Sequence, residues 1–549
     1  MVNRESLLAY RQSLTNKILG DPYDLVTYLQ RADIYLQLGY PDLAAGDAYR
    51  ALNLTDEVLN EGYEYHEQAS QSLEKYMGNP MVIPATISDW VSVDEVKQHA
   101  DNHADSYDAN ILALLASVRC FEVLSSGLWM LGCLQKAVSF CQRGLVISPD
   151  NTYLKTNEER IHKTAAVRLK RKDASISTYP DWGLARREVY PWNSLEPDRT
   201  SLEALERLNH ELSFMAPKCI VKTTELPALH QGEAKLDKDG NPETCFQLGV
   251  FAKEDIAAGE SVLHEYSLLT ASNRLKESIC DACGTELPPL GQDSTAVNCE
   301  ECYDTVFCDQ FCHDQAQEKY HPAVCERDVD SIARDVDSQE ADEALHLLLL
   351  ARVLAMASHQ EIHPLDVLEI KYIWGDFVPA TENDVEDVAA IVESTGLPPK
   401  SWTLPFNFEY NIEMPLHILE KMDIDVFKTV ENHDTWVFNS VLSKTRGTAS
   451  ARKNSRDGRP EVAAVHPFWC LANHDCNPNV TWEWGGRMTL WAREKRVVGD
   501  EEGNIRKGEE ILNHYCDVTL PVQERREWAC GSLGGWCMCD RCKREANEI

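Results

Sequence analysis

A run of eight cysteine and histidine residues between positions 280 and 325 constrains the fold of this chain most strongly. Thiolate and imidazole groups bind zinc, and a structural zinc ion takes four such ligands in a tetrahedron. Eight ligands predict two zinc ions, with no coordination position left open for catalysis. His313 is an alternative to one of the eight ligands. The predicted ligands are Cys280, Cys283, Cys299, Cys302, Cys308, Cys312, His321 and Cys325.

A second cysteine group, Cys537, Cys539 and Cys542, lies close to residue 549. Three thiolates leave a tetrahedral zinc ion one ligand short, so the fourth ligand must come from another part of the chain. A zinc knuckle with no catalytic meaning is the alternative interpretation.

Length and composition place the chain among multidomain globular proteins. With 549 residues, of which 43% are hydrophobic and 26% charged, it is too long for one core, and we expect two to four domains. We find no apolar run long enough to span a bilayer and no secretory signal at the start. The 19 cysteines are therefore expected to be metal ligands rather than disulfides, in the nucleus, the cytoplasm or both.

The formal net charge of −36 argues against direct nucleic-acid binding, because it opposes attraction to phosphate. An acidic surface favours basic partners such as lysine-rich protein segments, although acidity that serves only solubility explains the charge equally well. The basic stretch from Arg160 to Lys172 is either a nuclear-import signal or the exposed face of a helix.

The first third of the chain shows the spacing of paired helices. Its small and apolar residues resemble a tetratricopeptide repeat, a second copy follows at residues 124–149 with Gly132 at its turn, and residues 151–172 read as a capping helix. The middle segment, residues 55–108, matches the repeat pattern poorly. An ordinary helical bundle is the alternative interpretation of this helical region. The residues that carry the first copy are Ala32, Tyr35, Leu38, Gly39, Ala44, Ala48, Ala51 and Leu52.

An aromatic connector follows at residues 173–217, and its composition predicts an ordered segment, since disordered linkers seldom carry so many aromatics. Residues 247–263 then read as strand, turn and strand, which predicts a hairpin. Residues 344–357 are apolar nearly all round, which predicts a buried helix.

Three motifs occur in order in the second half: Asn473-His474-Asp475-Cys476-Asn477-Pro478-Asn479, then Glu510 to Asp517 with Tyr515, then the terminal cysteines. Together they resemble the SET domain of lysine methyltransferases. The resemblance implies that Gly249, Asn473, His474 and Tyr515 contact S-adenosylmethionine, that Tyr515 is the catalytic tyrosine, and that Cys476 is the fourth ligand of the terminal zinc ion.

One position departs from the family pattern. Gln247 stands where the first glycine of the usual Gly-x-Gly stretch is found, and only Gly249 matches. Glycine allows a ligand to approach the backbone closely, so a side chain at Gln247 narrows or reshapes the methionine end of the cofactor pocket.

The eight-ligand segment resembles a MYND zinc finger, and a MYND finger inserted in a SET domain is typical of the SMYD group. In that group the ligands interleave, which implies one ion on Cys280, Cys283, Cys308 and Cys312. The other ion would then lie on Cys299, Cys302, His321 and Cys325.

We therefore predict a multidomain α+β protein containing about three zinc ions. Its expected activity is transfer of a methyl group from S-adenosylmethionine to lysine in a histone or another protein, with protein partners at the repeats and the finger and no membrane association. The alternatives are a scaffold with a degenerate SET core and a methyltransferase with a small-molecule acceptor. The predicted parts are TPR-like helical repeats (1–172), a connector (173–217), the first SET part (218–279), the MYND finger (280–325), a helical SET insert (326–445), the SET core (446–520) and a post-SET segment (521–549).

Overall fold

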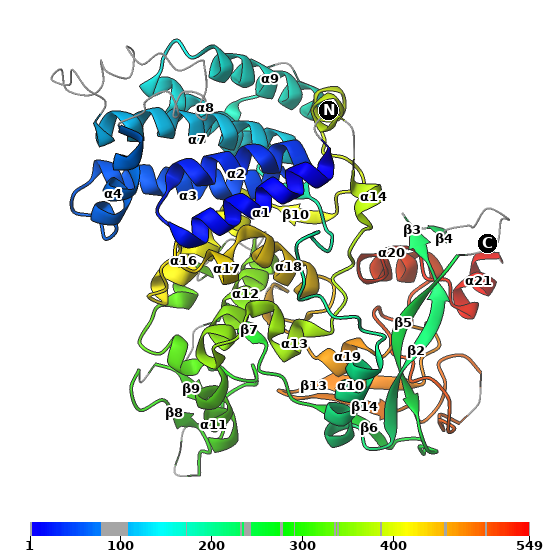
Figure 1. Ribbon diagram of the computed structural model, residues 1–549. Helices are drawn as coiled ribbons and strands as arrows, with labels where there is room; N and C mark the ends of the chain where they lie inside the picture. The colour runs from blue at the N-terminus through cyan, green and yellow to red at the C-terminus, as the bar shows by residue number, and fades with distance from the viewer. Residues whose placement is uncertain are drawn as a thin grey trace. The chain divides into compact units, whose positions relative to one another are not determined.

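A computed structural model gives the structure of the chain (Figure 1). Lys172 and residues 78–107 of the poorly matching middle segment lie outside the described residues. The structure describes residues 3–77, 108–171, 173–230, 233–234, 243–274, 278–289, 291, 293–302, 304–333, 336, 340–384, 387–454, 458–499 and 502–547.

The chain divides into two compact units. Unit 1 comprises Met1–Pro191 and Phe377–Ser440, and unit 2 comprises Trp192–Asp376 and Val441–Ile549. The helical insert predicted at residues 326–445 is therefore shared between the units, and its first part belongs with the zinc-ligand segment in unit 2.

Unit 1 is built mainly from helices that follow one another as antiparallel pairs (Figure 1). Its amino-terminal part confirms the predicted helical region, whereas its identity as tetratricopeptide repeats stays a prediction. The elements are α1 (Arg4–Gly20), α2 (Leu25–Leu38), α3 (Pro41–Leu59), α4 (His66–Met77), α7 (Ala109–Leu131), α8 (Leu134–Ile147), α9 (Thr152–Leu169), β1 (Gly183–Ala185), α14 (Ala380–Asn383), α15 (Val388–Thr395), β10 (Leu404–Phe406), α16 (Met414–Lys421), α17 (Val430–His433) and most of α18 (Thr435–Thr445).

Glycines contribute to the helix pairs of unit 1 in two ways: at the ends of helices and at a close contact between helices. Gly39 and Gly132 end α2 and α7 with φ angles of 78° and 87°, a left-handed conformation that glycine adopts without steric cost. The predicted turn at Gly132 is confirmed. Gly144 permits close packing, because a Cβ there would lie 2.5 Å from Leu154 Cδ1.

Helix α7 corrects the expectation that the chain has no apolar run long enough to cross a membrane. Among the described residues it is the one helix that passes this test of length and composition, but 89% of its most apolar 18-residue window is buried inside the protein. The polar Glu122 of this helix is also fully buried, and it accepts hydrogen bonds from Arg119 at 3.0 Å and Asn151 at 2.9 Å. A core helix of a helical domain has these properties.

Residues 377–440 complete unit 1 through buried charges. Arg31 donates two hydrogen bonds to the Asp47 carboxylate, at 2.7 and 2.6 Å, and lies 3.1 Å from Asp434. The aromatic connector is ordered, as predicted: β1 pairs with β10, and Tyr190 is 2% exposed. The two stretches of unit 1 are therefore joined by a fully buried ionic cluster as well as by a short sheet.

The described strands other than β1 and β10 belong to unit 2, where they form small antiparallel sheets ordered β2-β5, β13-β14-β6, β11-β12-β7, β8-β9 and β3-β4. Its strands are β2 (Cys219–Pro227), β3 (Leu229–His230), β4 (Glu233–Ala234), β5 (Thr244–Ala252), β6 (Ser261–Glu265), β7 (Thr270–Ser272), β8 (Val297–Asn298), β9 (Val306–Phe307), β11 (Ser450–Lys453), β12 (Pro460–Ala464), β13 (Val480–Trp484) and β14 (Met488–Ala492). Its helices are α10 (Leu202–Met215), α11 (Gln310–Lys319), α12 (Ala341–Gln360), α13 (Leu368–Lys371), α19 (Pro467–Cys470), α20 (Val522–Leu533) and α21 (Asp540–Asn547).

The predicted hairpin within residues 247–263 is wrong in its pairing, although both strands exist. Strand β5 pairs with β2 along nine residues, and β6 pairs with β14. The turn before β6 is held to the end of β14 instead of to β5, since Gly259 N–H donates to the Ala492 carbonyl at 2.9 Å. Strand pattern alone does not reveal which partner a strand takes.

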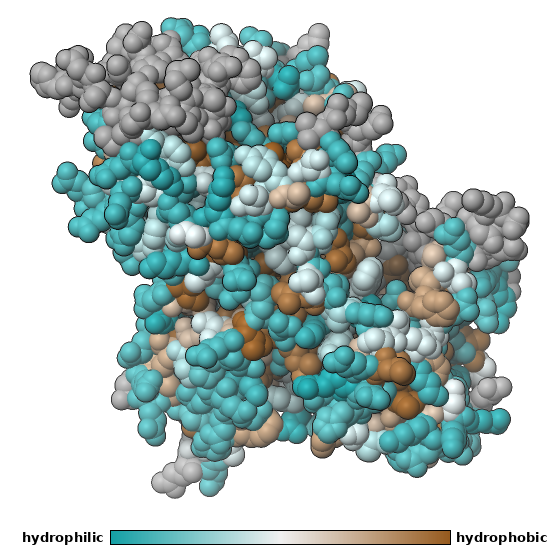
Figure 2. Space-filling view, viewed as in Figure 1, coloured by the Kyte–Doolittle hydropathy of each residue, from teal (hydrophilic) through white to brown (hydrophobic). Residues whose placement is uncertain are grey.

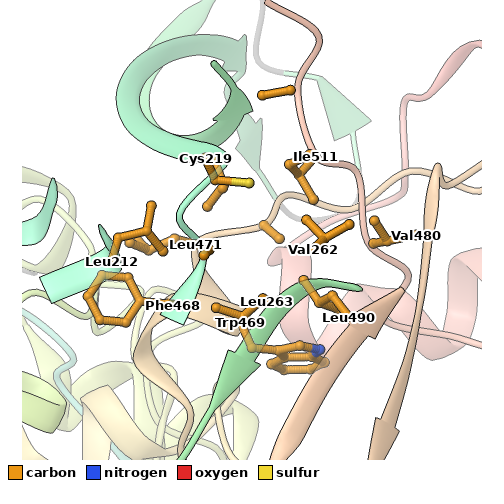
Figure 3. Packing of buried hydrophobic residues seen from close by; sticks show 14 of the residues in the cluster. Leu212, Cys219, Val262, Leu263, Phe468, Trp469, Leu471, Val480, Leu490 and Ile511 are labelled. Atoms are coloured by element: carbon orange, nitrogen blue, oxygen red, sulfur yellow. The ribbon is translucent and has the colours of Figure 1, made fainter. Parts of the chain in front are cut away.

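The core of unit 2 gathers apolar side chains from segments far apart in the sequence. In Figure 3, Leu212 of α10 and Cys219 of β2 lie in one cluster with Phe468, Trp469 and residues of β6 and β14. Ile511 joins the same cluster from the segment that precedes Tyr515. Burial of each large side chain contributes about 1.5–3 kcal/mol, so this cluster positions the segments that flank residues 473–480 and 511–515.

Most of the molecular face in Figure 2 is hydrophilic, with hydrophobic residues in small separate areas. This agrees with the 26% of the residues that are charged.

Helix α12 confirms the predicted buried helix, and it joins the zinc-ligand segment to the rest of unit 2. Its Arg352 guanidinium lies over the Tyr320 ring, 3.7 Å from the ring centre, and donates to the Asp281 carbonyl at 3.0 Å and the Leu268 carbonyl at 3.1 Å. Asp281 also accepts the Tyr320 hydroxyl hydrogen at 2.6 Å.

Glu265, at the end of β6, holds the short helix α19 in place. Its carboxylate is 1% exposed and accepts the Phe468 and Trp469 N–H groups, both at 2.9 Å. Burial raises the pKa of Glu265 to about 7, because removal from water disfavours the charged form.

We predict that Glu265→Gln changes how stability depends on pH. The folded protein keeps the Glu265 proton up to about pH 7, whereas the unfolded chain releases it near pH 4.5, so this stabilising contribution is complete below pH 4.5 and is lost as pH rises through 7. The glutamine of the Glu265→Gln variant does not titrate, so the variant does not lose this stability as pH rises. Relative to wild type, its free energy of unfolding should rise by on the order of 2–3 kcal/mol between pH 5 and 8, measured by urea titration. Parallel pH profiles would contradict this, and the exposed Glu254→Gln is the control.

Candidate active site and zinc centres

Two segments some forty residues apart lie side by side in unit 2. Asn513 N–H donates to the Asn473 carbonyl at 2.7 Å, and the Asn513 carbonyl accepts the Asp475 N–H at 2.9 Å. His474 and Asn513 form a parallel bridge, and Asn479 N–H donates to the Leu512 carbonyl at 3.1 Å. The structure thus brings the first and second predicted motifs into direct backbone contact.

Strand β5 brings Gly249 to the same place. Asn473 Nδ2 donates to the Leu248 carbonyl at 3.1 Å and to Glu510 Oε1 at 2.7 Å. A Cβ on residue 249 would lie 2.6 Å from Glu510 Oε1 and 3.1 Å from Asn473 Nδ2. A side chain at residue 249 would displace the Glu510 carboxylate from Asn473, so glycine preserves this contact. Glu510 is a site residue that the sequence analysis missed.

Tyr515 is half-buried beside this cluster. Its hydroxyl donates to the Ala472 carbonyl at 3.0 Å. Burial, together with the negative charges of Asp376 and Glu510, raises the pKa of the Tyr515 phenol well above its ordinary value. The phenol is therefore neutral near pH 7, and its oxygen retains lone pairs that can accept a hydrogen bond.

His474 connects Tyr515 to the terminal cysteines. Its Nδ1 accepts the Tyr515 N–H at 3.0 Å, so Nδ1 carries no hydrogen, and in the neutral ring the hydrogen is on Nε2. Nε2 lies 3.4 Å from Cys476 Sγ, a suitable distance for an N–H donor to sulfur. The imidazole is thus held at both nitrogens by the protein, so any cofactor contact of His474 involves its backbone or the ring face.

Cys476 meets the three terminal cysteines, as the SET resemblance implies. The sulfur atoms of Cys476, Cys537, Cys539 and Cys542 lie within 4.8 Å of one another, with Cys476 3.9 Å from Cys537 and 3.4 Å from Cys542. A tetrahedral zinc ion with bonds of about 2.3 Å needs sulfur atoms about 3.8 Å apart, so these residues fit zinc. The Arg525 guanidinium lies 3.6 Å from Cys542 Sγ and offsets thiolate charge.

Cys516, directly after Tyr515, is a residue the sequence analysis missed. Its buried thiol lies within 4.8 Å of both Cys476 Sγ and a ring nitrogen of His474. The His474 hydrogen bonds leave no free ring nitrogen for a metal, so His474, Cys476 and Cys516 lack the ligands of a separate zinc site. A spacing pattern could not have found Cys516, because no second cysteine stands near it in the sequence.

The segment 280–325 forms two ligand groups. Cys280, Cys283, Cys308 and Cys312 make one, and Cys299, Cys302, His321 and Cys325 make the other, each within 4.8 Å. Both groups are compatible with zinc fingers and interleave along the chain as the resemblance implies. His313 belongs to neither group and contacts Gln310 and Asp314 instead.

All 19 cysteines are free, which agrees with the expectation of thiols rather than disulfides.

Comparison with known proteins identifies the region that holds this site. Residues 247–516 match the model of the SET domain family. The chain is 34% identical over 77 residues to histone-lysine N-methyltransferase set5 of Schizosaccharomyces pombe, and 33% identical over 86 residues to the potential protein lysine methyltransferase SET6 of Saccharomyces cerevisiae. These alignments cover 14% and 16% of this chain and 22% and 21% of the relatives. A histone-lysine N-methyltransferase SET5 of Eremothecium gossypii is 37% identical over 78 residues, 14% of each chain.

The chain therefore contains a SET domain, with weak similarity to fungal SET methyltransferases. It aligns with about a fifth or less of the length of these curated relatives.

We predict that His474→Ala weakens the terminal zinc centre selectively. Loss of the N–H donor to Cys476 should lower affinity for that one ion by about 10–100-fold, the usual effect of removing a hydrogen-bond partner of a metal ligand. Zinc binding by the two ligand groups of the segment 280–325 should be unaffected. Zinc release to a chromophoric chelator, and the thiolate-to-cobalt absorption of the cobalt-substituted protein, provide the measurement.

His474→Gln keeps an N–H donor and should restore much of this affinity, and His313→Ala should change nothing. Equal zinc retention in wild type and His474→Ala would contradict the predicted link.

Proposed function

We propose that this protein is an S-adenosylmethionine-dependent protein-lysine N-methyltransferase with an SMYD-like arrangement, in which segment 280–325 is a MYND finger and the N-terminal helices are TPR-like. The observation that carries the proposal is the meeting of Asn473, Glu510, Gly249 and Tyr515 where two backbone segments pair inside the matched SET region.

Residues at this crossing are suited to hold the cofactor. Gly249 presents backbone without a side chain, and Asn473 and the backbone of His474 lie beside it. When bound, S-adenosylmethionine supplies a methyl group activated by its attachment to a positively charged sulfur.

The chain's own residues position the acceptor. The Tyr515 hydroxyl hydrogen is directed to the Ala472 carbonyl, so the Tyr515 oxygen can accept an N–H from a lysine amine and align that amine. Negative charges at Asp376 and Glu510 act on Tyr515 and favour the approach of a cationic lysine side chain, which releases a proton to solvent before its nitrogen can accept the methyl group. Alignment of the acceptor is the main catalytic contribution that these groups can make.

We propose a histone or another protein with a lysine-containing basic segment as the substrate, supported by the net charge of −36. The repeats and the finger are proposed to bind further proteins. Direct nucleic-acid binding and membrane association are not part of the proposal. The proposed location is the nucleus, the cytoplasm or both. The terminal centre and the finger would together hold about three zinc ions.

Tyr515→Phe provides the test. Removing the hydroxyl should lower the rate of methyl transfer to lysine-rich peptides by about 100-fold, comparable to losing one positioned hydrogen-bond group in other active sites, while cofactor binding measured by calorimetry stays within a few-fold. Tyr10→Phe is the matched control, because the Tyr10 side chain is exposed on α1, and it should leave the rate unchanged.

Other outcomes would select the other functions. Absence of cofactor binding by folded, zinc-replete protein would indicate a scaffold with a degenerate SET core. Transfer to small amines but not to peptides would indicate a small-molecule acceptor.

A further inference from the structure

Gln247, the departure from the usual glycine, has an arginine as its partner. Arg199 Nη1 lies 3.4 Å from Gln247 Oε1, and Arg199 Nε donates to the Tyr372 carbonyl at 2.9 Å. The guanidinium also lies 5.7 Å from the centre of the Trp374 ring. No motif in the sequence indicated Arg199, which lies 48 residues before Gln247.

Strand geometry places this pair next to the candidate active site. Side chains two residues apart in a strand point to the same face, so Gln247 projects from the face of β5 on which a Cβ of Gly249 would meet Asn473 and Glu510. Two residues along a strand span about 7 Å. The charge of Asp376 acts on both Arg199 and Tyr515, which also places the arginine near the tyrosine.

Arg199 is a cation without an ion pair in the described part of the chain. The nearby Glu196 is engaged by the buried Lys444, at 2.9 Å. Burial lowers the pKa of Arg199 to about 10, since its desolvation outweighs the attraction of Glu196 and Asp376. Of its five N–H groups, the structure assigns partners to Nε and Nη1, and the side chain remains partly exposed.

We propose that Arg199, assisted by Gln247, binds the carboxylate of the amino-acid part of S-adenosylmethionine. A guanidinium matches a carboxylate with two parallel hydrogen bonds, and the cofactor carboxylate would supply the direct ion pair that Arg199 lacks among the described residues. Gln247 then has a function that glycine could not perform: its carbonyl oxygen orients the guanidinium beside Gly249. This inference rests on the proposed function, because it names a binding residue of the same site.

Two ligands that differ only in the carboxylate test the proposal. Calorimetry on the zinc-replete full chain would compare S-adenosylmethionine with decarboxylated S-adenosylmethionine, which keeps the amine. Arg199→Met should weaken binding of the first by about 10–100-fold and of the second by less than about twofold. Arg199→Lys keeps the positive charge but not the paired N–H groups of the guanidinium, so its affinity for S-adenosylmethionine should fall between those of wild type and Arg199→Met. It also provides a second variant if Arg199→Met does not fold.

Gln247→Glu places a negative charge beside the guanidinium and should selectively weaken the carboxylate-bearing ligand. Arg207→Met is the matched control, because the Arg207 side chain is exposed on α10 and its one ion pair among the described residues is with Glu211, at 3.2 Å.

The outcomes separate this inference from the proposed function. If wild type binds both ligands equally, or if Arg199→Met and Arg199→Lys weaken both by the same factor, the carboxylate role of Arg199 is overturned while cofactor binding stands. If wild-type protein binds neither ligand, the proposed function fails and the inference fails with it.

Discussion

The backbone pairing of Asn513 with Asn473 and Asp475 is the contact on which the candidate active site depends. Asn513 is completely buried, and both hydrogen bonds to it are short, 2.7 and 2.9 Å. Breaking either one inside the protein would leave a buried polar group unsatisfied, at a cost of about 1–3 kcal/mol. This pairing holds Asn473, His474 and Tyr515 at one place although the chain separates them by about forty residues.

The His474 ring extends this arrangement to the carboxyl-terminal cysteines. One ring nitrogen accepts the Tyr515 N–H and the other faces the Cys476 sulfur, so the orientation of the ring depends on both neighbours. The cysteine group in turn contacts α20 through Arg525. The His474 ring therefore links the position of Tyr515 to the terminal cysteine group, whereas the segment 280–325 connects to the rest of unit 2 through Arg352 of α12.

Patterns of local spacing predicted much of the structure. Ligand pairs a few residues apart indicated cysteine groups that the structure brings together, the all-apolar run indicated α12, and Gly132 marked a helix end. Strand pairing was predicted wrongly for β5 and β6, because the alternation of residues in a strand does not identify its partner. Helix α7 was not recognised as an apolar run because its charged residues, such as Glu122, find buried partners only in the folded protein.

By itself the sequence determined the chemistry available to this protein: cysteine and histidine groups that suit zinc, an Asn-His motif, a tyrosine, and a strongly acidic charge. Short spacings carry that information because ligands on one turn or loop must meet the same ion. Only the tertiary structure decided which distant groups accompany them. Glu510 beside Asn473, Cys516 beside Cys476 and Arg199 beside Gln247 are contacts across long stretches of chain, and residue type and local period contain no information about such contacts.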